Sequence, residues 1–134
     1  MSENIKVSGL KTATDLSARQ FKAVQISASN TVATITNGNA EVPFGVLQNN
    51  PVGTTANPLS AEVVTFGETK AVAGGTITAG NFLSIDNTGG FIAAPYETSP
   101  ATADLYICAV ALESAVSGDT FRIHFFPGVK ASTE

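Results

Sequence analysis

The sequence is poor in the residues that build catalytic and metal sites. Its 134 residues include one cysteine, one histidine, one methionine and no tryptophan. The lone Cys108 cannot form an intrachain disulfide and supplies no thiol pair for zinc. His124 has no recognisable nucleophile motif or histidine-rich spacing around it, as triad chemistry or metal binding would require. We therefore predict a protein that is not an enzyme, with no catalytic residues, no metal and no cofactor.

Charge is also scarce. Charged residues make up 13% of the chain, and seven Lys and Arg stand against eleven Asp and Glu, for a net charge of −4. Nucleic-acid binding needs a basic surface, so we expect no nucleic-acid partner. No stretch approaches the roughly 18 apolar residues of a membrane span, and the first residues lack the apolar run of a signal peptide. We expect no membrane partner and a protein made in reducing cytoplasm.

Short runs rich in Val, Ile, Thr and Phe recur between Gly, Asn and Pro residues. This rhythm is typical of an all-β domain. We predict a small antiparallel β-barrel or β-sandwich, with surface loops at 49–58 and 95–103. The predicted strands cover 21–28, 31–36, 44–47, 61–67, 69–73, part of 76–86, 91–94, 105–112 and 121–126, with a turn at Gly67-Glu68.

One helix is predicted, a short turn over Leu16–Gln20 whose first free N–H groups Asp15 can cap. The segment before it is polar and has no obvious partner within the fold. We therefore divide the chain into an extended N-terminal arm (1–13), a single β domain (14–128) and a polar tail (129–134). Pro127-Gly128 is expected to end the last strand.

Two segments are candidate contact surfaces. Residues 105–112 are almost continuously apolar, which favours a strand covered on both faces, one of them by a neighbouring subunit. In the last strand Phe121, Ile123 and Phe125 share one face, and the alternate residues share the other. The candidate subunit interface comprises Leu105, Ile107, Val110, Leu112, Arg122, His124 and Phe126.

Simpler interpretations compete at single residues. Cys108 lies in an apolar run, where a thiol behaves as a small buried hydrophobe, and His124 reads as a residue on an exposed strand face. Lys70 resembles the lysine of a biotinyl or lipoyl carrier hairpin, but the methionines that flank the biotin site are missing. A solvated strand lysine is the default interpretation there.

Several stretches together resemble the small capsid decoration, or cement, proteins of tailed bacteriophages, which stabilise the phage head. The stretches are 13–24, 44–49, 67–83, and 107–113 followed by Gly118-Asp119 and a terminal strand, within residues 9–127. The resemblance implies a β-rich virion protein that binds the exterior of the mature capsid, commonly as trimers at local threefold positions, and clamps neighbouring major capsid proteins.

The resemblance also implies the partners and the location. We expect the major capsid protein and further copies of this chain, in a homotrimer, as partners, with synthesis in the host bacterial cytoplasm before assembly on the capsid exterior. The arm is then the candidate capsid contact, although a terminus of this kind can also be a frayed end. The candidate capsid-contact residues are Ser2, Glu3, Asn4, Ile5, Lys6, Val7 and Lys11.

An alternative function is a phage tail or surface adhesin module that recognises a host glycan. Sugar sites usually present exposed aromatic platforms. The chain has no tryptophan and only two tyrosines, Tyr96 and Tyr106, so it is poorly supplied for that role.

Overall fold

The computed structural model describes residues 3–38, 41–94 and 105–131. In these residues the fold is all-β, as predicted: eleven strands form one open, mixed sheet, and a barrel or sandwich is not confirmed. No helix in the described ranges is long and apolar enough to cross a membrane. The strands are β1 (Asn4–Val7), β2 (Lys11–Thr12), β3 (Ala23–Ala28), β4 (Thr31–Thr34), β5 (Gly45–Leu47), β6 (Leu59–Ser60), β7 (Val63–Val72), β8 (Phe82–Ile85), β9 (Phe91–Ala93), β10 (Leu105–Ala111) and β11 (Thr120–Ala131).

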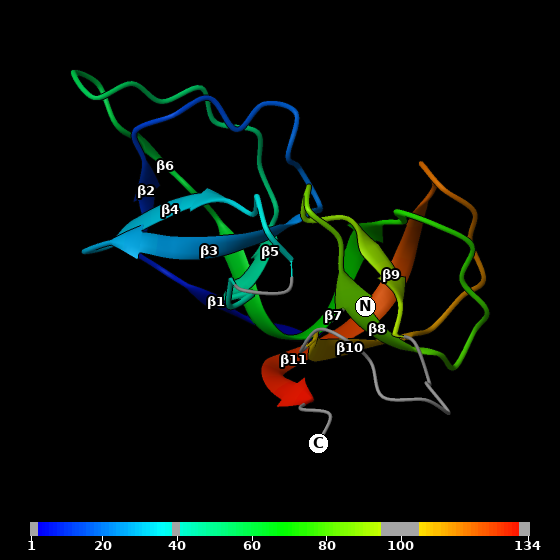
Figure 1. Ribbon diagram of the computed structural model, residues 1–134. Coiled ribbons are helices and arrows are strands. Elements are labelled where there is room, and N and C mark those ends of the chain that lie inside the picture. The colour runs from blue at the N-terminus through cyan, green and yellow to red at the C-terminus, as the bar shows by residue number, and fades with distance from the viewer. Residues whose placement is uncertain (1–2, 39–40, 95–104, 132–134) are drawn as a thin grey trace.

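The long strand β7 joins the two halves of the molecule. Strands β2 to β6 lie on one side of it and β8 to β11 on the other, in the sheet order β6-β2-β4-β3-β5-β7-β11-β10-β8-β9 (Figure 1). Residues 63–64 of β7 pair with β5, and residues 67–72 pair with β11. The predicted turn at Gly67-Glu68 is wrong. Gly67 has a φ of 110°, but partners on both sides of this point carry the strand through it.

The buried apolar residues form two core clusters. The larger cluster lies mainly among β7 to β11 and extends to Ala23, Ile35 and Val46. It includes Phe91 and Phe125, whose rings meet edge to face with centroids 6.4 Å apart. The smaller cluster fills the other half. It comprises Leu10, Leu16, Val24, Val32, Leu47, Ala61 and Val63, with Val7 and Phe44 packed against it.

The predicted helix at Leu16–Gln20 is absent. Asp15 Oδ1 does accept the expected hydrogen bond from the Ser17 N–H at 2.8 Å, but the bond closes a turn. Arg19 N–H then donates to the carbonyl of Leu16, and Phe21 follows with a φ of 64°. A positive φ ends helical geometry. Two tertiary bonds hold the segment in this shape, from Leu16 N–H to the Pro51 carbonyl and from Phe21 N–H to the Leu47 carbonyl.

The segment assigned to a free arm belongs to the sheet. Strand β1 pairs antiparallel with β7, and β2 lies between β4 and β6. Leu10 and Thr12 are buried. The pairing of β2 with β4 is parallel, which makes the sheet mixed and corrects the antiparallel prediction.

The last strand continues through Pro127 to Ala131, so the predicted tail begins inside β11. Its register with β10 is irregular at this point: Ala109 pairs with Phe125, whereas Ile107 pairs with Val129. Pro127 and Gly128 fall in the gap between these two pairs. A proline has no N–H to donate to a neighbouring strand. Pro127 lies where the regular pairing of β10 with β11 is interrupted.

Candidate functional site

Strand β11 has the two faces that its sequence predicts. Phe121, Ile123 and Phe125 are buried in the larger core. On the opposite face Arg122 is exposed, and His124 and Phe126 are half-buried. Because alternate side chains of a strand point to opposite sides, this outer face is available for contact with another molecule.

A row of apolar and aromatic side chains crosses the outer face from strand to strand. Val110 on β10 is paired with Phe82 on β8 and with His124 on β11. Directly paired residues of an antiparallel ladder point to the same face. Phe66 on β7 meets His124 edge to face, and Ile5 on β1 is paired with Phe66. We call this set the outer stripe: Ile5, Phe66, Phe82, Val110, His124 and Phe126.

The outer stripe leaves much apolar surface in solvent. Ile5 is 60% exposed, and Phe66 and Phe82 are each 44% exposed. Single exposed apolar side chains are ordinary on protein surfaces, but contiguous ones mark interaction sites. Five neighbouring strands contribute to this patch, so it is built by the tertiary fold.

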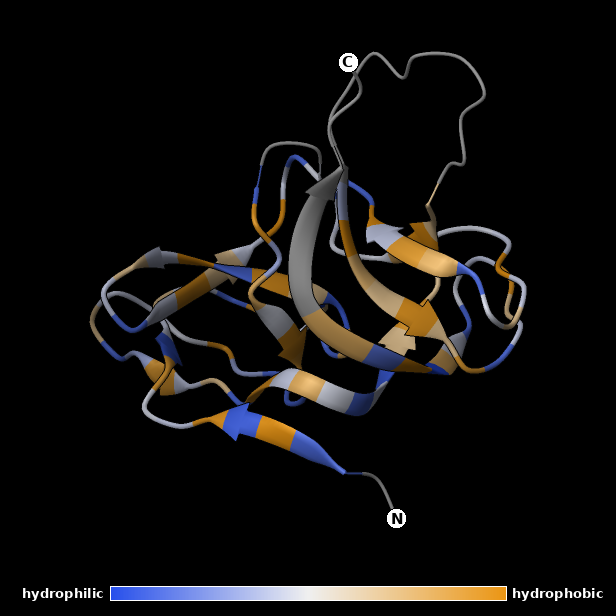
Figure 2. Cartoon of the chain, turned by 90° about the horizontal axis from the view of Figure 1, so that it is seen from below, coloured by the Kyte–Doolittle hydropathy of each residue, from blue (hydrophilic) through white to orange (hydrophobic). Residues whose placement is uncertain are grey.

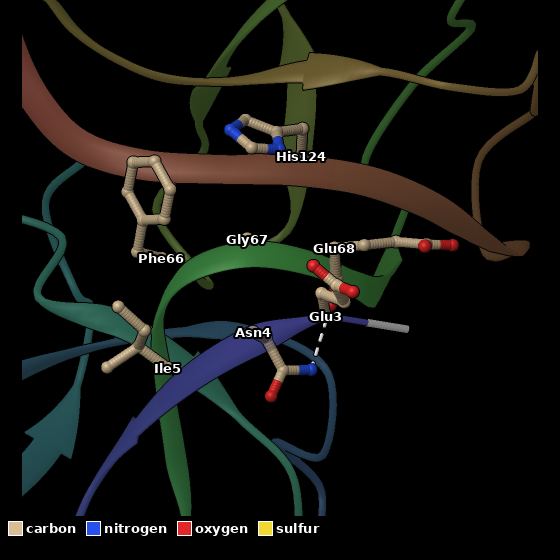
Figure 3. A pocket seen from close by; sticks show the side chains of 7 residues that line it. All are labelled: Glu3, Asn4, Ile5, Phe66, Gly67, Glu68 and His124. Carbon is tan, nitrogen blue, oxygen red and sulfur yellow. Dashed lines mark hydrogen bonds between the residues drawn. The ribbon is translucent and has the colours of Figure 1, made fainter. Parts of the chain in front are cut away.

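A hollow of about 590 Å³ lies at one end of the outer stripe. Figure 3 shows Phe66, Ile5 and His124 around it, with strand β1 forming one wall. The Phe66 and His124 ring centroids are 5.2 Å apart and their planes meet at 84°. We call it the β1 groove, lined by Glu3, Asn4, Ile5, Phe66, Gly67, Glu68 and His124.

Ionic side chains border the outer stripe. The Arg122 guanidinium contacts Glu113 at 2.8 Å and Glu68 at 3.3 Å. The side-chain hydrogen bond from Arg122 lowers the pKa of the Glu113 carboxyl, and the same bond raises the pKa of Arg122. All three groups are solvent-accessible, so the pairs contribute little to stability. The two ion pairs hold the Arg122 side chain at the edge of the outer stripe.

The structure divides the candidate capsid-contact residues. Glu3, Asn4 and Ile5 line the β1 groove. Lys6 and Val7 border a separate hollow of about 320 Å³. Lys11 is exposed on β2 and lines neither hollow, while Ser2 lies outside the described residues.

The candidate subunit-interface residues are divided in the same way. Val110, His124 and Phe126 belong to the outer stripe, and Arg122 lies at its margin. Leu112 is exposed just beyond β10, and Ile107 is half-buried. The side chain of Leu105 lies outside the described part of the chain. The structure thus brings parts of the two predicted surfaces, the arm and the face of β11, onto one surface.

Sequence reasoning missed Phe66 and Phe82. Strict alternation would place Phe66 on the same face as Val64, which is fully buried. Val63 and Val64 are consecutive and both buried, so the alternation of buried and exposed side chains is broken there. The irregular register with β1 and the positive φ of Gly67 accompany this break. No periodic signal in the sequence marks Phe66 as exposed.

The remaining chemical candidates, Cys108 and Lys70, lie away from the outer stripe in buried or paired strand positions. Cys108 is buried, as predicted, and burial raises the pKa of its thiol to about 12. Lys70 lies within β7, with its Nζ 5.9 Å from the centroid of the Phe21 ring, whereas a carrier lysine would stand at a hairpin tip. Among the described residues, no three His, Cys, Asp or Glu side chains are grouped to hold a metal ion.

Comparison with known proteins identifies a structural neighbour. No family model and no curated protein sequence matches the chain. Among solved structures, the chain is similar to the N base of the head fiber protein gp8.5 of bacteriophage phi29, with a TM-score of 0.59. The match covers 98% of this chain and 100% of that one, at 13% sequence identity. At this identity the likeness shows a shared fold.

Proposed function

We propose that this protein is a structural component of a tailed-phage virion that binds the outer surface of the capsid. The observation that carries the proposal is the fold match over 98% of the chain to a base from a phage head fiber. It agrees with the sequence resemblance to capsid decoration proteins, which rests on separate information. The proposed role is non-enzymatic and needs no cofactor.

The outer stripe is the proposed contact surface. It exposes Ile5, Phe66 and Phe82 on a chain with few charges. Burial of apolar area against a partner supplies the main favourable term in protein association, about 25 cal/mol for each Å² removed from water. We assign it to the contact with the major capsid protein and, through Val110, His124 and Phe126, to contacts between copies in a trimer.

The proposed mechanism is stabilisation by mass action. A protein that binds the expanded shell and not its dissociated parts stabilises that shell in proportion to RT ln(1 + [L]/Kd). This gain in stabilisation free energy is repeated at every occupied lattice position. Because each bound copy contacts neighbouring major capsid proteins, it clamps them together. A trimer would use one heterologous interface three times and close without forming fibres.

Sedimentation tests the proposal. The purified protein is mixed with expanded capsids of the phage that encodes it, and saturable co-sedimentation is expected. Phe66→Ser should weaken binding. The matched control is Val116→Ser, which changes an apolar residue that is 56% exposed and lies outside the outer stripe. Absence of binding by the unaltered protein would overturn the proposal and make a glycan-binding screen the next test.

Two further measurements separate the parts of the proposal. A mass of about 41 kDa for the free protein, three times 13.7 kDa, is expected if trimers form before assembly. Deletion of residues 2–7 is expected to abolish capsid binding without unfolding the domain. The deletion stops there because Leu10 and Thr12 are buried. Normal decoration by the shortened protein would exclude a capsid contact through β1.

A further inference from the structure

Strand β1 is held to the fold mainly by backbone hydrogen bonds. Its ladder runs antiparallel to residues 63–67 of β7. The Glu68 N–H donates to the Glu3 carbonyl at 3.0 Å, and Asn4 Nδ2 donates to the Glu68 carbonyl at 2.9 Å. Of its own side chains, Asn4, Ile5 and Lys6 are exposed, and only Val7 packs against a core cluster. Figure 2 shows the strand near the N-terminus at the margin of the molecule.

A short, open connection links β1 to the rest of the chain. Ser8 and Gly9 are both exposed, and the buried Leu10 follows at once. Gly9 has a φ of 84°, and a Cβ at this position would meet no atom within 4 Å. Because both residues are exposed and the space around Gly9 is open, the dihedral angles of this connection can change without unpacking a buried side chain.

The seat that β1 occupies on β7 is shaped for an extended strand. At Gly67 the backbone of Glu3 and Asn4 lies so close that a side chain on residue 67 would collide with it. Beside it, Phe66 is paired with Ile5. The outer edge of β1 is a poorer acceptor, because β1 is short, carries Lys6 and has a register irregularity after Ile5.

We propose that the β7 edge accepts β1 from a second copy of this chain, so that copies exchange their N-terminal strands when they assemble. The proposal rests on the self-association included in the proposed function. The occupant is β1 in either case, because β1 of a second copy has the same sequence and can make the same hydrogen bonds to β7 as β1 of the same chain. In the exchanged form the exposed Ser8-Gly9 connection would cross from one copy to the other.

Exchange has a consequence for the β1 groove. Glu3, Asn4 and Ile5 would come from one copy, and the residues of β7 and β11 from its neighbour. The proposed contact surface would then be assembled from two chains. Such a ring of heterologous contacts closes after a fixed number of copies.

Cysteine trapping tests the exchange. One population carries Ile5→Cys and a second carries Phe66→Cys, at directly paired positions. The two are mixed, refolded together under reducing conditions and then oxidised. Several-fold more disulfide-linked heterodimer is expected than from a control mixture of Ile26→Cys and Phe66→Cys, in which Ile26 is also exposed but lies on β3. The buried Cys108 is retained in all variants.

A chain that carries both Ile5→Cys and Phe66→Cys is the positive control, since it can form the disulfide whichever copy supplies β1. If this double variant oxidises but the mixed single variants give no more heterodimer than the control mixture, the exchange is overturned. The experiment uses purified protein without capsids. A failure of capsid binding and a failure of strand exchange are therefore observed separately.

Discussion

The ring of Phe66 stands edge-on to the imidazole of His124, with the two planes at 84°. The contact joins strand β7, where β1 is seated, to the outer face of β11. It places the sole histidine beside a large apolar ring that is 44% exposed. An aromatic pair of this geometry contributes about 0.5–1.5 kcal/mol beyond its buried area. The pair lies on the outer face of the sheet, whereas the ring of Phe125 is buried in the core below that face.

Replacing Phe66 by alanine should affect binding far more than folding. The side chain is half in solvent, so we expect a loss of only about 1–2 kcal/mol in the free energy of unfolding, the contact with His124 included. Phe125→Ala, on a fully buried residue, should cost about 3–5 kcal/mol. Urea unfolding of both variants, together with capsid co-sedimentation of Phe66→Ala, measures the difference. Equal destabilisation by the two changes would contradict the assignment of Phe66 to a contact surface.

Gly67→Ala should loosen β1. Gly67 and Gly80 both have positive φ, 110° and 91°, so alanine strains the backbone at either position by about 1 kcal/mol. Only at residue 67 does the added methyl group also collide with β1. Hydrogen exchange of the β1 amides should therefore accelerate in Gly67→Ala and stay unchanged in Gly80→Ala. The same exchange rates in both variants would show that β1 does not depend on this close approach.

Glu41 should make part of the stability pH-dependent. Its carboxylate accepts bonds from Thr36 Oγ1 at 2.7 Å, from Thr36 N–H at 2.8 Å and from Gln25 Nε2 at 2.9 Å. Burial alone would raise the pKa of this carboxyl, but the bonds from Thr36 outweigh it and hold the pKa below 4.5. The stabilisation by the Glu41 carboxylate is therefore complete above pH 4.5. It is lost as the pH falls through the lowered pKa of Glu41.

The matching variant is Glu41→Gln. We expect it to be less stable than the unaltered protein by about 1 kcal/mol near neutral pH. The difference should shrink at a strongly acidic pH below the lowered pKa of Glu41, where the unaltered side chain takes up a proton. Urea unfolding at the two pH values measures it, with the exposed Glu62→Gln as control. A difference that is the same at both pH values would show that the charge of Glu41 is not responsible.

Ser84→Ala should stabilise the fold. The Ser84 hydroxyl is buried on β8, 1% exposed, and its Oγ has no hydrogen-bond partner among the residues that the structure describes. Leaving such a group unsatisfied costs about 1–3 kcal/mol, so removing it should raise Tm. The control is Ser114→Ala, because the Ser114 Oγ accepts a bond from the Ala79 N–H at 3.0 Å. A lower Tm for Ser84→Ala would mean that its hydroxyl is bonded in solution.

Local patterns predicted strands well where alternation and burial agree. The two faces of β11 follow from its residue order alone, because Phe121, Ile123 and Phe125 repeat with the period of a strand. The hairpin of β3 and β4 follows in the same way, with Asn30 at a φ of 55° in its turn. The helix predicted at residues 16–20 does not form. Backbone hydrogen bonds to Pro51 and Leu47, which are distant in sequence, outweigh the local preference for a helical turn.

Composition and periodicity by themselves determined the all-β class, the buried Cys108 and the outward face of β11. Each of these features depends on the hydrophobicity or the β-strand propensity of residues that are neighbours in the sequence. Only the tertiary structure decided that β1 pairs with β7, that β2 pairs with β4 in parallel, and that Ile5, Phe66 and His124 meet. These contacts join residues far apart in the sequence, from 20 positions between Lys11 and Thr31 to about 60 between Ile5 and Phe66. Strand pairing over such distances is selected by the packing of the whole sheet, which no local pattern records.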